Sequence, residues 1–266
     1  MGRTLCEAKY GLACGRHFAL SELETFMDTW NIEDTRKHIL RIHGADQLEL
    51  AKPALNSTTL MSHYAKYHYH EAKKLLGNLT TKQFKENYPI ELVLGLLTEK
   101  EKQKLELSII KIEANIIACL FNIHAIADTL SHIVYYSFGL NLADNKLSEV
   151  GVNITSVSNL IKSNNHFSSV HKLLESLIND GDFDHLSAIV NCAKHRGIKR
   201  LKFSASGAEN LGEPLSLKIP SYTYKTKSFP EIDLKIFLNN QYNRISKLNI
   251  DTGIEINKII NTISWL

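Results

Sequence analysis

Residues 99–138 run for nearly forty positions without proline or glycine, and the run ends at Gly139. A capping box, Thr98-x-x-Glu101, stands at its start, where each side chain can satisfy the other's free amide. Apolar residues recur at helical spacing, at positions 105, 109, 112, 116, 117, 120, 123 and 127. The pattern predicts one long helix that forms the spine of a helical bundle.

Further helix-start patterns of the capping-box type begin at Ser21, Thr80 and Ser228. With the hydrophobic periodicity they predict helices at about 19–30, 33–43, 58–76, 81–87, 157–162, 166–179, 183–196 and 230–263.

Residues 201–226 depart from helical spacing, because apolar and polar residues alternate on both sides of Gly207–Pro214. Alternation around a turn segment is typical of a β-hairpin. The predicted fold class is therefore mainly α, a helical bundle with a long central helix and a small β-hairpin excursion near 201–226. We expect either an N-terminal helical region, 1–98, followed by a bundle, 99–266, or one single domain, 1–266.

Composition limits the compartment and the partners. The apolar run 114–127 is fourteen residues long, short of the ~20 that span a membrane, so we expect a core helix and no membrane partner. The four cysteines form no CxxC pair, and the N-terminus has no apolar signal core, which favours the cytoplasm. The net charge of +3 is too small to predict nucleic-acid binding without local clustering.

Sequence motifs for several enzyme classes are missing. Nothing matches GxxxxGK[ST], GxGxxG, GxSxG, HExxH or paired CxxC. We therefore expect no cofactor and no metal, and neither an ATPase, a Rossmann dehydrogenase, an α/β-hydrolase nor a zincin.

His124, Asp128 and His132 fall at i, i+4 and i+8 of the long predicted helix, so they share one stripe. One interpretation is a catalytic or metal-binding row in which Asp128 orients a neighbouring imidazole. The other is a polar pairing that only fixes the register of a buried helix.

The segment NCAKHRGIKRLK, 191–202, carries the densest positive charge. Basic residues in a last helical turn, followed by Gly197, are what a helix C-terminus favours. The basic run nevertheless continues beyond the glycine, and cations on both sides of a turn can hold phosphate oxygens. The residues concerned are Lys194, His195, Arg196, Lys199, Arg200 and Lys202.

Two other helices carry cations. One helical stripe consists of His63, Tyr67, His70 and Lys74. Such a stripe could stack bases and bind phosphates, or it could be the solvent-exposed face of an amphipathic helix. The segment 36–43 is again basic at a helix end, with Gly44 behind it.

With a helical core, the segment Val190-Asn191-x-x-Lys194-His195-Arg196 and the row His124-x-x-x-Asp128 before it, the chain resembles HEPN-like proteins over roughly residues 100–200. The resemblance implies a bundle that often dimerises and often acts as a metal-independent endoribonuclease in bacterial defence or toxin–antitoxin systems. The expected partners are RNA, a second copy of the chain, and a protein partner or antitoxin. The family's usual R-x(4–6)-H spacing occurs only at Arg36–His43, so two working sites stay open.

Metal-free RNA cleavage needs a base, an acid and positive charge on the phosphorane. His195 would be the acid or base, Arg196 and Lys194 the electrostatic stabilisers, and Asn191 the residue that orients the ring. His124 and Asp128 would supply the second proton-transfer group if the two helices face each other. The alternative is a non-catalytic helical dimer whose basic rim binds RNA or a protein, and a third hypothesis is a metalloprotein built on the row of His124.

Overall fold

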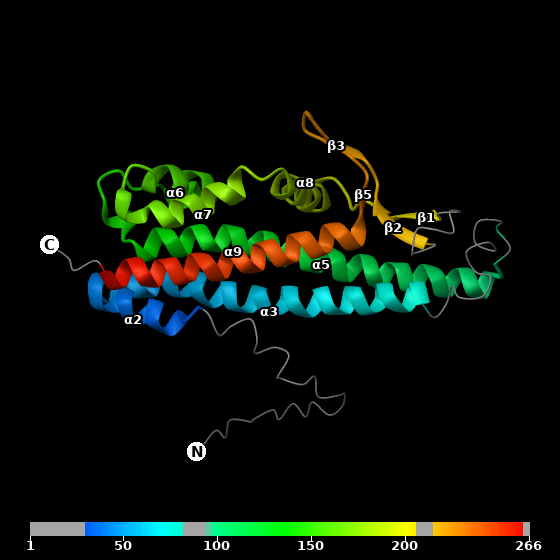
Figure 1. Cartoon of the computed structure of the whole chain (residues 1–266), viewed down its shortest axis with the longest axis horizontal. Helices are drawn as coiled ribbons and strands as arrows, with labels where there is room; N and C mark the ends of the chain where they lie inside the picture. The colour runs from blue at the N-terminus through cyan, green and yellow to red at the C-terminus, as the bar shows by residue number, and fades with distance from the viewer. Residues whose placement is uncertain (1–29, 82–94, 96, 206–214, 263–266) are drawn as a thin grey trace, which may run out of the picture.

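The computed structural model describes residues 30–81, 95, 97–205 and 215–262. These residues are mainly helical, with small antiparallel sheets in the C-terminal half, which confirms the predicted fold class (Figure 1). The elements of the framework are α2 (Ile32–His43), α3 (Ala45–Thr81), α5 (Glu99–Ser137), α6 (Ile154–Ile161), α7 (Ser168–Ile178), α8 (Gly181–His195) and α9 (Leu234–Thr262).

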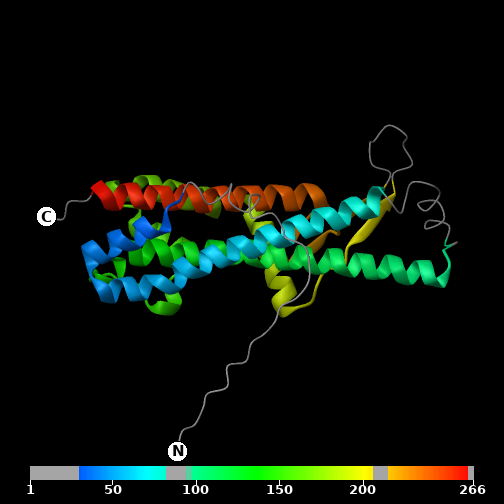
Figure 2. The ribbon, with the colours of Figure 1, turned by 90° about the horizontal axis from the view of Figure 1, so that it is seen from below.

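The three longest helices, α3, α5 and α9, lie side by side and form the body of the bundle (Figures 1 and 2). Gln47 Nε2 donates to the Tyr136 carbonyl over 2.7 Å, and His68 Nδ1 lies 2.9 Å from Asn115 Oδ1. Because the early part of α3 meets the late part of α5, these two helices are antiparallel.

Helix α9 also runs antiparallel to α3. Thr58 Oγ1 donates to Asn249 Oδ1 over 3.1 Å, and the ring of Tyr69 stacks on Tyr242 with centroids 4.0 Å apart. Helices α5 and α9 therefore point the same way, and one buried core extends from residue 30 to residue 260.

The helix α5 has nearly the predicted bounds, and its N-terminus has the predicted capping box. Thr98 Oγ1 accepts from the Glu101 amide, and the Glu101 carboxylate accepts from the Thr98 amide. By length and composition alone α5 could cross a membrane, but in the fold it packs against α3, α8 and α9. The cytoplasmic location stays a prediction.

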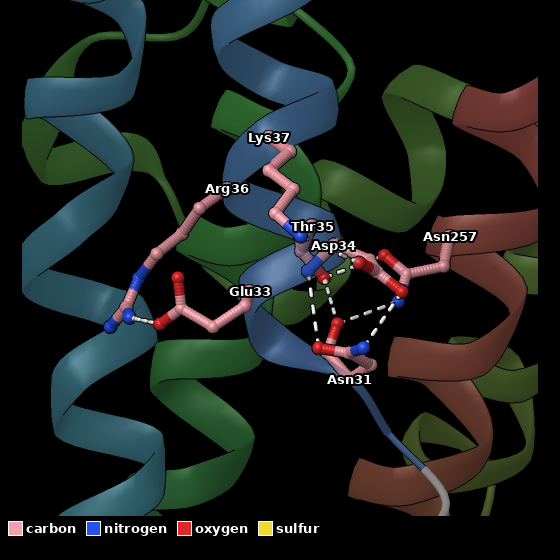
Figure 3. A network of polar contacts seen from close by, with 7 residues as sticks. All are labelled: Asn31, Glu33, Asp34, Thr35, Arg36, Lys37 and Asn257. Atoms are coloured by element: carbon pink, nitrogen blue, oxygen red, sulfur yellow. Dashed lines mark hydrogen bonds and ion pairs between the residues drawn. The ribbon is translucent and has the colours of Figure 1, made fainter.

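The short helix α2 is fastened to α9 by a polar network (Figure 3). Thr35 Oγ1 donates to Asn257 Oδ1 over 2.6 Å, and Asn257 Nδ2 donates to the Asn31 carbonyl over 2.8 Å. Trp30 completes the joint: its indole N–H donates to Thr35 Oγ1, and its buried ring lies directly over Gly253 of α9.

A second layer, α6, α7 and α8, covers the face of α5 and α9 that lies opposite α3 (Figure 1). The start of α8 is fixed to α9 by an ion pair of 2.7 Å between Asp180 Oδ2 and Arg244 Nη1. Gln241 Nε2 also donates to the Asp182 carbonyl. These contacts hold α8, which carries the basic segment, in a set position.

The strands form two small antiparallel sheets. In the first, β1 (Lys202–Ala205) pairs with β2 (Leu215–Ile219), as the predicted hairpin requires, and β2 also pairs with β5 (Ile232–Asp233). In the second, β3 (Tyr222–Tyr224) pairs with β4 (Lys227–Phe229), with Tyr222 opposite Phe229. The second hairpin extends beyond the predicted 201–226.

Some predicted boundaries are wrong. Ser228 lies in β4, so the capping box expected there does not form; Asp233 Oδ1 accepts from the Ile236 amide and α9 begins at Leu234. Helix α3 is longer than the predicted 58–76 and contains Pro53 in its interior. Proline removes one backbone hydrogen bond there, but packing maintains the helix. Almost all of the helices predicted at 19–30 and 81–87 falls outside the described residues.

Candidate functional site

The basic segment begins at the C-terminus of α8. The amides of Arg196 and Gly197 both donate to the Cys192 carbonyl over 2.8 Å, and Gly197 has a φ of 131°. Lys194 and His195 occupy the last turn, where the helix dipole favours basic residues. The segment therefore does form a helix C-cap, but a C-cap does not account for the cations after Gly197.

Two cations, one on each side of Gly197, lie against the β3–β4 hairpin. The guanidinium of Arg196 lies 5.0 Å from the ring centroid of Tyr224, and the ammonium of Lys199 lies 5.7 Å from that of Tyr222. Lys225, in the turn between the two strands, places its ammonium 5.7 Å from the Tyr224 centroid. The hairpin thus brings a cation of its own next to those that follow α8.

The cations that gather at this end of α8 are all exposed, as is His195, and together these residues form what we call the α8 basic surface. Within the described part of the chain, no carboxylate lies within ion-pair distance of any of them. Its members are Lys194, His195, Arg196, Lys199 and Lys225.

Two other predicted nucleic-acid contacts are paired with carboxylates. Arg200 Nε lies 3.2 Å from Glu113 on α5, and Lys202 Nζ lies 3.7 Å from Glu231, which it shares with Lys218 at 3.1 Å. Both cations remain exposed, but each has a carboxylate nearby, so we expect each to contribute less to an anion site than Lys199 does.

His185 lies beneath the hairpin. It is buried, and its ring packs against Tyr222, Phe229 and Phe237, with centroids 4.9–5.6 Å away. Burial lowers the pKa of His185 below its ordinary value of 6.5, and no hydrogen bond within the described chain reaches its buried Nε2. The hairpin therefore packs on an imidazole whose neutral form is favoured by burial.

The row on α5 is separate from this surface. His124 Nδ1 lies 3.3 Å from Asp128 Oδ2, but the geometry is not that of a hydrogen bond, and the His124 ring stacks on Phe183 in the first turn of α8. His195 lies at the other end of α8, roughly 18 Å further along the axis at 1.5 Å per residue. The structure therefore does not bring His124 and Asp128 to His195.

The remaining members of the predicted catalytic set are also placed. Asn191 is partly buried, and within the described chain no hydrogen bond joins its side chain to that of His195, one turn later. His132 lies one turn beyond Asp128 on α5 and stacks on Tyr136. Among the described residues, no three His, Cys, Asp or Glu side chains gather as a metal site would require.

The Arg36–His43 pair occupies α2. The Arg36 guanidinium contacts Glu33 and donates to Asn56 Oδ1 over 2.6 Å, as Figure 3 shows in part. His43 Nε2 lies 3.2 Å from the Ser137 carbonyl, and burial lowers the pKa of His43. Seven residues of helix place the two side chains roughly 10 Å apart along the axis.

The stripe on α3 keeps Tyr67, His70 and Lys74 exposed, with Lys74 paired to Glu71 at 3.4 Å. Helix α3 lies on the opposite side of the bundle from α8 (Figure 1). These three residues are therefore not part of the α8 basic surface.

The hairpin residues that organise the surface, Tyr222, Tyr224 and Lys225, were not among the predicted site residues. They lie in the alternating segment YTYKTK, where lysines interleaved with aromatic residues are the signal that could have identified them. No protein-family model matches the chain, and neither a curated protein nor a solved structure shows a significant match to it. The likeness to HEPN-like proteins thus stays a prediction.

Proposed function

We propose that this protein binds RNA through the α8 basic surface. The observation that carries the proposal is that Lys194, Arg196, Lys199 and Lys225 gather without a matching carboxylate in the described chain. Many other cations, such as Lys102 and Lys258, are neutralised by an acidic residue three positions away.

An array of exposed cations favours a polyanion over a single small anion. Each lysine or arginine that neutralises a phosphate releases counterions, so affinity increases with the number of phosphates that are contacted. Arginine adds a planar fork that suits phosphate oxygens. The resemblance to HEPN-like proteins also implies RNA as the ligand, and it implies a homodimer and an antitoxin-like protein partner.

Fluorescence anisotropy with a labelled single-stranded RNA tests this proposal. We expect the Lys194→Gln/Arg196→Gln/Lys199→Gln variant to bind roughly tenfold more weakly than the parent or worse, because three phosphate contacts are lost. The matched control, Lys52→Gln/Lys102→Gln/Lys258→Gln, removes the same charge from ion-paired positions. Equal losses in both variants would reduce the effect to net charge and contradict a site at α8.

Metal-independent cleavage is the second candidate function, and one observation favours it. His195 is exposed between Lys194 and Arg196, so an imidazole that can exchange protons lies among groups that can hold a phosphate. His124 cannot be the second proton-transfer group, and nor can its neighbour Asp128, because His124 packs against Phe183, at the opposite end of α8 from His195. A second copy of the chain would be one source of that group.

A cleavage assay separates the two functions. RNA incubated with the parent in EDTA should be cut if His195 is a general acid or base, and His195→Gln should lose cutting while keeping RNA affinity. Intact RNA, with binding retained in the parent, would leave the protein as a binding module.

A further inference from the structure

The β3–β4 hairpin is held against α8 by aromatic contacts that fix the cations of the α8 basic surface. Arg196 lies over one ring of the hairpin, Tyr224, and Lys199 lies over the other, Tyr222. A cation held over a ring keeps the N–H groups that point away from the ring free to donate to phosphate oxygens. The rings therefore restrict where the cations can point without occupying their donors.

The two tyrosines are poorly placed for stacking on bases. Tyr222 is only 8% exposed, because Phe229 and His185 cover it, and its hydroxyl donates to the His185 carbonyl over 3.4 Å. Tyr224 is partly buried and carries two cations, Arg196 and Lys225, over its ring.

We infer that Tyr224 is a positioning residue that holds Arg196 and Lys225 for the phosphate backbone, so the surface recognises phosphates and not bases. The inference rests on the proposed function in taking RNA as the ligand. It adds that the phosphate is the group that is recognised, and that Tyr224 positions the cations that recognise it. Binding should then be nearly independent of base sequence, as expected for contacts to phosphates alone.

The geometry of the turn supports this role. Lys225 has a φ of 53°, a left-handed conformation that is uncommon for a side-chain-bearing residue. Tyr224 lies opposite Lys227, whose ammonium pairs with Asp184 of α8 at 2.5 Å. The hairpin is thus anchored to α8 by Lys227, which leaves the cation of Lys225 exposed and without a carboxylate in the described chain.

The test compares two ligands that share phosphates and differ in bases: a single-stranded RNA and inorganic polyphosphate of similar charge. Tyr224→Leu should weaken the binding of both by a similar factor, roughly fivefold, because two cation–ring contacts are lost. Tyr224→Phe keeps the ring and should bind both ligands as the parent does. Tyr64→Leu, which changes an exposed tyrosine on α3, is the matched control and should change neither.

Each result bears on the inference. If Tyr224→Leu weakens RNA binding but not polyphosphate binding, the ring contacts bases and the inference is wrong. If it weakens neither, Tyr224 positions nothing that matters for binding, and the inference is again wrong. A thermal melt and a circular dichroism spectrum like the parent's show that a loss is not unfolding; if Tyr224→Leu does not fold, the comparison of Tyr224→Phe with Arg196→Gln replaces it, and equal losses there would overturn the inference.

The inference and the proposed function can fail separately. If the parent binds polyphosphate in a Tyr224-dependent way but not RNA, the positioning role stands and the RNA proposal falls. If the parent binds RNA with an affinity that depends strongly on base sequence, the proposal of RNA binding stands, but the inference that the surface recognises phosphates and not bases is wrong. If the parent binds neither ligand, both fall.

Discussion

The imidazole of His185 is enclosed by three aromatic rings, and burial lowers its pKa below 6.5. In the unfolded chain this imidazole binds a proton near pH 6.5, whereas in the folded chain it binds one only at a lower pH. The contribution of neutral His185 to the free energy of unfolding is therefore present above pH 6.5 and is lost as the pH falls. Asp182 acts in the opposite direction, but burial dominates.

We therefore predict that the free energy of unfolding falls between pH 7.5 and pH 5.5, and that His185→Phe makes this fall smaller. Urea unfolding at the two pH values measures it. His38 and His43 have pKa values lowered in the same direction, so part of the pH dependence should remain in the variant. An unchanged dependence in His185→Phe would contradict this account of His185.

Gly253 is the second residue with a definite role. A Cβ at this position would lie 1.9 Å from the Trp30 ring, whereas one at Gly77 of α3 meets nothing within 4 Å. We expect Gly253→Ala to destabilise the fold by about 2 kcal/mol, because the indole must move out of its packed position. Gly77→Ala should stabilise by up to ~1 kcal/mol through helix propensity. Thermal unfolding of both variants checks the opposite signs.

At the scale of elements, α8 is held by its N-terminal end. Arg244 of α9 pairs with Asp180, donates to Gln241 over 2.6 Å and lies over the ring of Phe183. Because the pair is only about a quarter exposed, it should be worth more than a surface ion pair.

We predict that Arg244→Met costs about 1–2 kcal/mol and speeds amide exchange in α8 more than in α5. Lys102→Met, which breaks an exposed pair with Glu99, should change stability by less than about 0.5 kcal/mol. Hydrogen exchange read by mass spectrometry distinguishes a local loosening of α8 from uniform destabilisation, which would contradict the clamp.

The sequence predicted elements well where local signals agreed. Helix α5 followed from its periodicity and its capping box, and both are present. The start of α9 was predicted wrongly because Ser228-x-x-Glu231 has the capping pattern, although pairing with Tyr222–Tyr224 draws Ser228 into a strand. Strand pairing across the hairpin overrides a capping signal that is worth only about 1 kcal/mol.

The candidate site was predictable only in part for a similar reason. The cluster of cations at 194–202 is visible in the sequence, but which of them are neutralised depends on Glu113 and Glu231, which are distant in the chain. Likewise the i, i+4 spacing correctly predicted that His124 and Asp128 are close, but not that His124 packs against Phe183, at the opposite end of α8 from His195.

On the scale of the whole molecule, the charge of +3 is modest, and its distribution decides what the protein can bind. The α8 basic surface lies on one side of the bundle, and α3, with Tyr67 and its neighbours, lies on the other (Figure 1). An RNA strand at α8 therefore need not contact α3. The homodimer remains a prediction.

The most direct test of RNA binding at the α8 basic surface is the salt dependence of affinity. A plot of the logarithm of the association constant against that of the salt concentration should have a slope of about −3 for the parent, since its four cations contact phosphates at about −0.7 each. The Lys194→Gln/Arg196→Gln/Lys199→Gln variant should lose about two units of that slope. A slope that is the same in parent and variant would show that the phosphates are bound elsewhere and would contradict the central claim.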